Sequence, residues 1–165
     1  MRFQPSPVAR LVGCSVDEPG AVARVGASLP FGFMTYASPT EIEQVAGTTG
    51  FRILRRERRP AVGFCPRLDR LHVSLGQREH LGQRGELLLE FINERLAVIR
   101  FFPSDITAYS AALREAGIKP DTKGRFTISA EIGGWVATYD DGRQHAGWQD
   151  LRLARKELEW VSACS

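Results

Sequence analysis

The fold of this chain is decided by the stretch from Glu86 to Phe102, which reads ELLLEFINERLAVIRFF. Two apolar segments, 86–92 and 95–102, flank the dipeptide Asn93-Glu94. A two-residue connection that contains Asn, which tolerates a positive φ, is typical of a tight β-hairpin. The run Leu87-Leu88-Leu89 exceeds simple alternation, which indicates strands covered at least in part on both faces. The stretch therefore predicts the central hairpin of an antiparallel sheet.

Further short apolar segments, bounded by Pro and Gly, predict the remaining strands. Those upstream of the central hairpin are 31–36, 51–58, 61–65 and 68–75. Downstream, segments 125–132 and 135–140 are predicted to form a hairpin that turns at Gly133-Gly134. The segment DGRQHAG that follows, residues 141–147, reads as a polar turn.

A first helix is predicted to begin at Ser38. The tetrad Ser38-Pro39-Thr40-Glu41 combines an N-cap serine, a proline at the first helical position and the glutamate of a capping box. Gly47 is expected to end this helix. Its predicted inward residues are Ile42, Val45 and Ala46.

Two further helices are predicted in the second half of the chain. One is capped by Ser104 or Asp105 and ends at Gly117; its inward residues are Ile106, Tyr109, Leu113 and Ala116. The other is a terminal amphipathic helix from Gln149 to about Cys164. Its predicted inward stripe is Leu151, Ala154, Leu158 and Val161.

Length and composition favour one domain. A chain of 165 residues with 43% hydrophobic residues can bury one sizeable core but is short for two. Residues 1–30 are predicted to be an irregular lead-in, with a short strand or helix near 21–25. Residues 31–165 are predicted to form a single α+β domain, in which an antiparallel sheet of β-hairpins carries two to three helices packed on one side.

The layout of the chain has a known counterpart. The stretch GELLLEFINERLAVIRFFPSDITAYSAAL, followed by a hairpin that contains Trp, resembles small bacterial binding proteins of the helix-plus-antiparallel-sheet type. That group includes outer-membrane assembly lipoproteins and secreted enzyme inhibitors. The resemblance covers roughly residues 30–145 and implies a sheet face presented to another protein. It rests on no diagnostic motif, so it assigns no functional residue.

Positive charge is concentrated in one part of the chain. The formal net charge is only +3, yet five arginines lie in the eight residues from Arg52 to Arg59. Their guanidinium groups offer planar forks for carboxylate or phosphate. Trp148, in a glycine-flanked segment, is predicted either as an exposed interface anchor or as a core residue. The candidate partner-binding residues are Arg52, Arg55, Arg56, Arg58, Arg59, Arg67, Arg70 and Trp148.

Three interpretations of the arginine-rich stretch stay open. It can bind an acidic protein surface, bind the phosphates of nucleic acid, or protect the edge of a sheet from aggregation. An acidic protein is favoured over nucleic acid, because the stretch lacks interleaved aromatic residues and the rest of the chain is net acidic. The leading hypothesis is therefore a non-enzymatic protein-binding module of the inhibitor, immunity or assembly-factor type.

Motifs for catalysis or cofactor binding are missing from the sequence. It contains no GxSxG, P-loop or GxGxxG pattern, and its three histidines lack the spacing of metal ligands. No cofactor and no metal ion are therefore expected. A further hypothesis is a small hydrolase or transferase that uses His145 with Asp140 and Asp141, or His72 near Asp69.

The cysteines favour a reducing compartment. Cys14, Cys65 and Cys164 lie far apart and without Cys-x-x-Cys spacing, so they are predicted to be thiols of a cytoplasmic protein. The stretch Leu11-Val12-Gly13-Cys14 has the form of a bacterial lipobox. Prolines and an arginine interrupt the apolar stretch that a signal peptide needs before such a site, so no lipid anchor is expected. No segment approaches the roughly 20 apolar residues of a membrane span.

Overall fold

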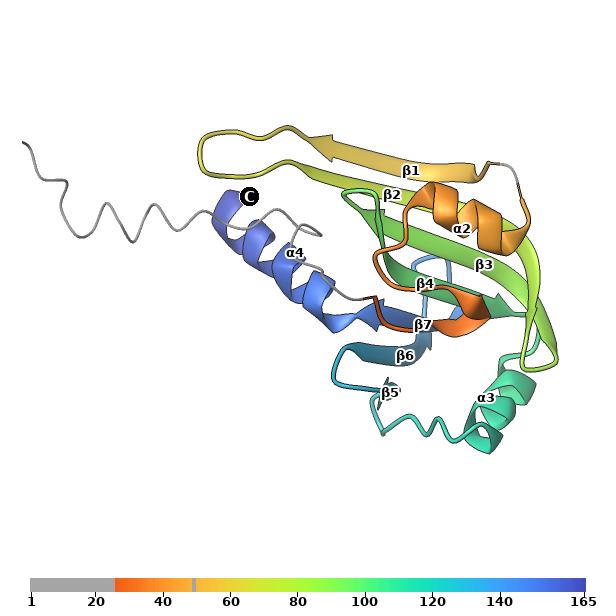
Figure 1. Cartoon of the computed structure of the whole chain (residues 1–165). Helices are drawn as coiled ribbons and strands as arrows, with labels where there is room; N and C mark the ends of the chain where they lie inside the picture. The colour runs from red at the N-terminus through yellow and green to blue at the C-terminus, as the bar shows by residue number, and fades with distance from the viewer. Residues whose placement is uncertain (1–25, 49) are drawn as a thin grey trace, which may run out of the picture.

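The structure, a computed structural model, describes residues 26–48 and 50–165 (Figure 1). This part of the chain forms an open antiparallel sheet of seven strands in the order β1-β2-β3-β4-β7-β6-β5. The strands are β1 (Arg52–Arg59), β2 (Leu68–His80), β3 (Gln83–Ile92), β4 (Arg95–Pro103), β5 (Arg125–Thr127), β6 (Ile132–Thr138) and β7 (Gln144–Asp150). The helical elements are the 3-10 turn η1 (Pro30–Gly32) and the helices α2 (Pro39–Ala46), α3 (Ile106–Glu115) and α4 (Leu151–Cys164). The predicted α+β fold class is confirmed.

The central hairpin forms as β3 and β4, where it was predicted. Asn93 and Glu94 have φ values of 48° and 63°, which is the left-handed pair that a two-residue hairpin turn requires. The register places Leu87 opposite Phe101 and Leu89 opposite Ile99.

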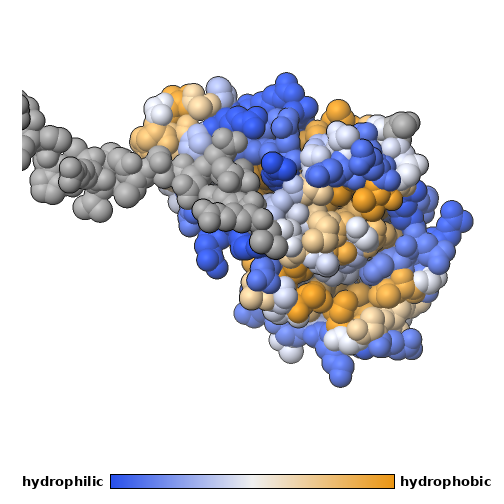
Figure 2. Space-filling model, viewed as in Figure 1, coloured by the Kyte–Doolittle hydropathy of each residue, from blue (hydrophilic) through white to orange (hydrophobic). Residues whose placement is uncertain are grey.

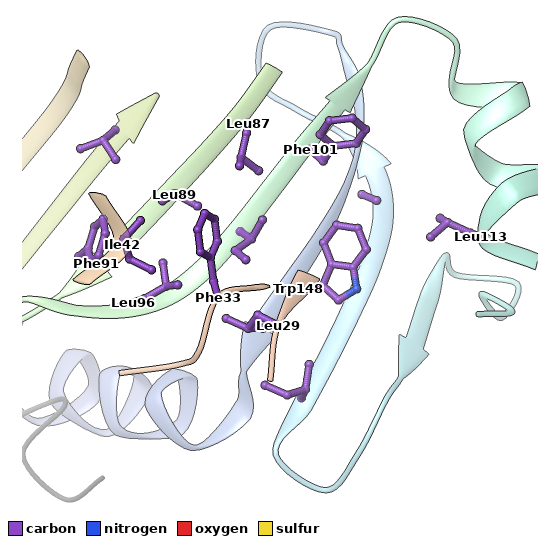
Figure 3. Packing of buried hydrophobic residues seen from close by; sticks show 14 of the residues in the cluster. Leu29, Phe33, Ile42, Leu87, Leu89, Phe91, Leu96, Phe101, Leu113 and Trp148 are labelled. Carbon is purple, nitrogen blue, oxygen red and sulfur yellow. The ribbon is translucent and has the colours of Figure 1, made fainter. Parts of the chain in front are cut away.

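One face of the sheet carries the larger hydrophobic cluster. Leu87 and Leu89 of β3 and Phe101 of β4 point to this face, together with Trp148 of β7 (Figure 3). The segment before α2, α2 itself and α3 close the cluster from outside the sheet. They contribute Leu29, Phe33, Ile42, Tyr109 and Leu113. Two helices therefore pack on this face.

The opposite face carries a second, smaller cluster. Ile92 follows Phe91, and Val98 precedes Ile99; Phe91 and Ile99 belong to the larger cluster. Because neighbouring side chains of a strand point to opposite faces, Ile92 and Val98 point to the other side of the sheet. There they pack against Leu153 and Trp160 of α4. The helix α4 thus covers part of the second face, beside β1 and β2.

The caps of the first two helices agree with the sequence. The Glu41 N–H donates to Ser38 Oγ at 3.2 Å, and the Ser38 N–H donates to a Glu41 carboxylate oxygen at 2.6 Å, which completes the capping box. Asp105 caps α3 by accepting from the Ala108 N–H at 3.0 Å. Two inward residues were predicted wrongly: Val45 of α2 and Ala116 at the end of α3 are exposed.

Two strands predicted in the first half of the chain do not form. Residues 31–36 contain the end of the turn η1 and Met34 of an isolated bridge to Ser28. Phe31 and Tyr36 have positive φ values, which lie outside the range of a regular strand. Residues 61–65 form the tip of a hairpin between β1 and β2. The strand β2 is longer than predicted and runs through a bulge at Gly76, whose φ is 70°.

The C-terminal part of the sheet differs most from the prediction. The Gly133-Gly134 pair lies inside strand β6, and the turn before it is made by Ser129, whose hydroxyl accepts from the N–H groups of Glu131 and Ile132. Residues 144–150, read in part as a polar turn, form β7 between β4 and β6. Gly133 and Gly134 therefore allow close packing within a strand and do not form a turn.

Helix α4 forms where it was predicted but buries a different face. Leu153 and Trp160 are buried, whereas Leu158 of the predicted stripe is 66% exposed. The buried stripe also contains Glu157, which pairs with Arg70, and Cys164. Hydrophobic periodicity does not report these polar and sulfur contacts.

The structure joins Cys65 to Cys164 in a disulfide, so the prediction of free thiols is wrong for this pair. The two residues are 99 positions apart, with their Cα atoms at 5.8 Å. Sequence spacing did not reveal the bond because it depends on the end of α4 reaching the β1–β2 loop.

Several predictions fall at or beyond the start of the described residues. The lipobox at Leu11-Val12-Gly13-Cys14 and the short element near 21–25 lie outside them. Leu29, placed in the lead-in, is buried in the larger cluster, so the packed domain begins before residue 31. None of the described helices is long and apolar enough to cross a membrane.

Candidate functional site

The candidate site is the arginine hairpin, which we define as β1, the loop 60–67 and the first residues of β2, 68–70. Strand β1 lies at the end of the sheet order (Figure 1), and nearly all its side chains are exposed. It pairs with β2 from Arg52 opposite Ser74 to Arg59 opposite Leu68, with a bulge between Ile53 and Arg55.

Two of the predicted partner-binding arginines are held by the protein's own carboxylates. Arg56 binds Asp69 with two hydrogen bonds, Nε to Oδ1 at 3.2 Å and Nη2 to Oδ2 at 2.7 Å. These bonds raise the pKa of Arg56. Arg70 bridges Glu57 and Glu157 and is largely buried. Both arginines therefore stabilise the hairpin.

Glu57 and Glu157, the carboxylates beside Arg70, have opposite pKa shifts. The hydrogen bond from Arg59 is the main cause that lowers the pKa of Glu57. Burial raises the pKa of Glu157 above its usual range.

Other arginines of the hairpin present their guanidinium groups to solvent. The side chains of Arg55 and Arg58 are 72% and 67% exposed, and their carboxylate contacts are long, 4.0 Å to Glu57 and 3.7 Å to Asp69. Arg52 is similarly exposed, although it contacts Glu86, and Arg59 is about half exposed. Exposed pairs of this kind are weak and are readily exchanged for a partner's carboxylate.

The arginines surround a hollow of about 370 Å³. Its charged lining combines the four arginines 56, 58, 59 and 67 with Asp69 and Glu94. Leu68 and Pro60 form the apolar part of the wall of this hollow. A concave, mainly cationic surface is suited to a carboxylate-bearing group.

The tip of the hairpin is apolar, which the sequence interpretation did not anticipate. Val62 and Cys65 exchange two backbone hydrogen bonds of 3.0 Å around Gly63-Phe64. This tight turn leaves Val62 and Phe64 69% and 52% exposed. Figure 2 shows hydrophobic surface at the loop beside strongly hydrophilic surface. The two prolines that bracket the loop, Pro60 and Pro66, were the available signal that 61–65 is a turn.

Helix α4 braces the hairpin from one side. Besides the Cys65–Cys164 disulfide, the Trp160 indole N–H donates to the Pro66 carbonyl at 2.7 Å. The Arg59 guanidinium lies over the Trp160 ring, 5.6 Å from its centre. The exposed tip is therefore fixed to the end of α4 by a disulfide, a hydrogen bond and a cation–π contact.

The structure corrects the interpretation of Trp148 as an exposed anchor. Trp148 lies in β7 and is 1% exposed. Its ring makes edge contacts with Phe126 and His80 in the larger cluster. Trp148 is thus a core residue and lies away from the arginine hairpin.

His145, one histidine of the hydrolase hypothesis, lies among aromatic side chains. His145 is buried, stacks on Phe102 and accepts a hydrogen bond at Nε2 from the Trp135 indole at 2.9 Å. Asp141 forms its ion pair with Arg143 rather than with His145. The described residues contain no cluster of His, Cys, Asp and Glu suited to a metal ion.

His72 belongs to a polar cluster that the sequence did not predict. Its Nε2 lies 3.8 Å from Glu90, which pairs with Arg100 at 3.1 Å. Arg100 in turn lies over the rings of Trp135 and Tyr139. Asp69 binds Arg56 on the hairpin, so it does not pair with His72.

Burial of His145 predicts a loss of stability in acid. Burial lowers the pKa of His145 to about 4. In the unfolded chain the pKa of this histidine has its ordinary value, so as the pH falls the unfolded chain takes up the proton before the folded protein does. The stability from the neutral ring is therefore present above about pH 6.5 and is lost toward pH 4. Between pH 7 and pH 5 we expect this residue to lower the free energy of unfolding by roughly 2 kcal/mol. Urea unfolding at both pH values measures the loss.

The variant His145→Gln is the matched control, because its side-chain oxygen can still accept from Trp135 but does not titrate. Its stability should fall less between the two pH values. Some pH dependence should persist, because burial also lowers the pKa of His72 and His80. An unchanged slope in His145→Gln would mean that the ring is not held neutral.

Comparison with known proteins adds no family: no family model, no curated protein and no solved structure matches the chain significantly.

Proposed function

We propose that the protein is a non-enzymatic binding module that recognises an acidic surface of another protein through the arginine hairpin. The observation that carries the proposal is the combination, on one braced hairpin, of exposed guanidinium groups along β1 with exposed Val62 and Phe64 at the tip. Arginine and aromatic residues are enriched at protein interfaces and supply many of their strongest contacts. Cationic side chains beside an apolar tip fit a partner with an apolar spot next to an acidic surface.

The composition of the hairpin favours protein over nucleic acid. Its arginines lie beside Glu57 of β1 and Asp69 of β2, so the hairpin is not the uninterrupted positive surface that follows a phosphate backbone. Single-strand binding also uses several aromatic rings as stacking platforms, whereas the loop exposes Phe64 beside the aliphatic Val62. Nucleic-acid binding stays the alternative that the same positive charge allows.

We further propose that the protein works in an oxidising compartment. A disulfide such as Cys65–Cys164 persists outside the reducing cytosol and is rare within it. The proposal replaces the cytoplasmic expectation, which depended on all three cysteines being thiols.

The double variant Arg55→Ala/Arg58→Ala tests the binding role. Both side chains are exposed with only long carboxylate contacts, so their loss should leave thermal stability nearly unchanged. We expect affinity for the partner to fall at least roughly tenfold, because interface arginines are frequent hot spots. The measurement is capture of proteins from an extract of the source organism on the immobilised full-length chain.

The matched control is Arg84→Ala/Arg114→Ala, which removes the same charge from exposed positions on β3 and α3. A partner should be retained by the wild type and by this control, and lost by the hairpin variant. Equal capture by both variants would place the binding surface elsewhere. Loss of capture after nuclease treatment would favour nucleic acid, and competition by anionic lipid vesicles would favour a membrane surface.

A further inference from the structure

Strand β1 is the long free edge of the sheet. The strands β1 and β5 end the sheet order, and β1 has eight residues whereas β5 has three. Among the described residues, β1 pairs with no strand other than β2. A strand paired on one side presents backbone N–H and C=O groups on the other, and these can hydrogen-bond to an added strand.

The arginines of β1 lie on both faces of this edge. Arg55 and Arg59 stand opposite His72 and Leu68 of β2, on the face that α4 partly covers. Arg56 and Arg58 stand opposite Leu71 and Asp69, and point to the other face. A strand laid along β1 therefore meets guanidinium groups on each of its faces.

The same charges disfavour a second copy of this chain as the added strand. Strand β1 contains five arginines and one glutamate. Pairing two copies of β1 would place like charges on directly opposite or diagonal positions, which destabilises a strand pair. A strand that carries carboxylates instead gains an opposite-charge pair at these positions.

We infer that the partner of the arginine hairpin binds by strand addition, as an extended acidic segment that pairs with β1 and becomes the eighth strand of the sheet. This inference rests on the proposed function and names the conformation of the partner. Backbone hydrogen bonds supply affinity along β1, and carboxylates of the segment pair with the arginines on the face to which they point. Apolar side chains of the segment cover Ile53 and Leu54, which are exposed on β1.

The test uses a fluorescent eight-residue probe of alternating glutamate and threonine. Only alternate amides of an added strand face its neighbour. Because arginines lie on both faces of this edge, either the glutamate or the threonine amides of the probe can face β1. The control peptide therefore carries backbone N-methyl groups on every residue, with the same charge. We expect the full-length protein to bind the parent probe and to bind the methylated form at least roughly tenfold more weakly, since that form cannot donate to β1. Hydrogen exchange should show new protection within residues 52–59.

The arginine variants separate this inference from the proposed function. Binding of the parent probe should fall in Arg55→Ala/Arg58→Ala and persist in Arg84→Ala/Arg114→Ala. If the methylated peptide binds as the parent does, or if the parent peptide does not protect residues 52–59, strand addition is wrong. Arginine-dependent capture of a protein partner would then keep the proposed function, as recognition of a folded acidic surface. If neither peptides nor captured proteins depend on Arg55 and Arg58, both proposals fail.

Discussion

Opening the Cys65–Cys164 disulfide is expected to lower the free energy of unfolding by about 4 kcal/mol. The bond joins residues 99 positions apart. In the chain-entropy account, a cross-link over such a length removes many conformations from the unfolded state and stabilises the fold by about 4–5 kcal/mol. Most small domains have only about 5–15 kcal/mol of stability in total. The loss should therefore be visible as a large shift of the urea midpoint.

The measurement compares urea unfolding of the wild type, with and without reductant, with that of Cys65→Ser/Cys164→Ser. The reduced wild type and the double variant should agree, and reductant should not affect the variant further. Cys14→Ser is the control, because it removes a sulfur that does not take part in this bond. Equal stability of oxidised and reduced wild type would show that the bond does not contribute.

Loss of the bond should also loosen the candidate site locally. The disulfide fixes the loop 60–67 to the end of α4, together with the Trp160 contact to Pro66. Without it, Val62 and Phe64 are no longer held on a rigid base, and their ordering on binding has an entropic cost. Stability and the proposed partner binding should therefore both decrease when this bond is lost.

The elements that sequence predicts well are those whose signals are local. The hairpin β3–β4 has a two-residue turn at Asn93-Glu94 between long apolar strands. The positive φ values of both turn residues and the pairing of the two strands follow from this turn. The start of α2 follows from Ser38 and Glu41, which are three residues apart. Nothing distant is needed to form these elements.

The elements that sequence predicts poorly depend on partners far along the chain. Helix α4 has an apolar stripe through Leu158, but it turns Glu157 inward because Arg70 of β2 binds that carboxylate. Strand β7 contains His145 and Gly147 and reads as polar, yet it lies between β4 and β6. Its burial follows from neighbours that periodicity cannot locate.

The candidate site was predicted in its charge but not in its shape. The arginine-rich edge strand is present, and Arg55 and Arg58 remain exposed. Sequence could not distinguish these from Arg56 and Arg70, because the carboxylates that bind the latter two come from β2, β1 and α4. The apolar tip was read as a strand, so its exposure was not expected.

The Gly133-Gly134 pair, which reads as a turn, leads to a second large expected effect. A Cβ at Gly134 would lie 2.2 Å from two atoms of the Phe126 ring and 2.6 Å from the Gly147 carbonyl oxygen. The ring is packed in the larger cluster against Trp148, and the carbonyl belongs to β7. Neither group can move without disturbing the core. We expect Gly134→Ala to lower the free energy of unfolding by about 3 kcal/mol, since overpacking of a closed core costs about that much.

The adjacent glycine supplies the control for this prediction. A Cβ at Gly133 points to the other face of β6, where its nearest neighbour is Leu151 Cδ2 at 3.0 Å. That methyl group is the end of a flexible side chain, so Gly133→Ala should cost less than about 1 kcal/mol. Urea unfolding of both variants at neutral pH measures the difference. A turn at Gly133-Gly134 would penalise the two substitutions alike, through backbone conformation, whereas a strand packed on Phe126 penalises Gly134→Ala far more.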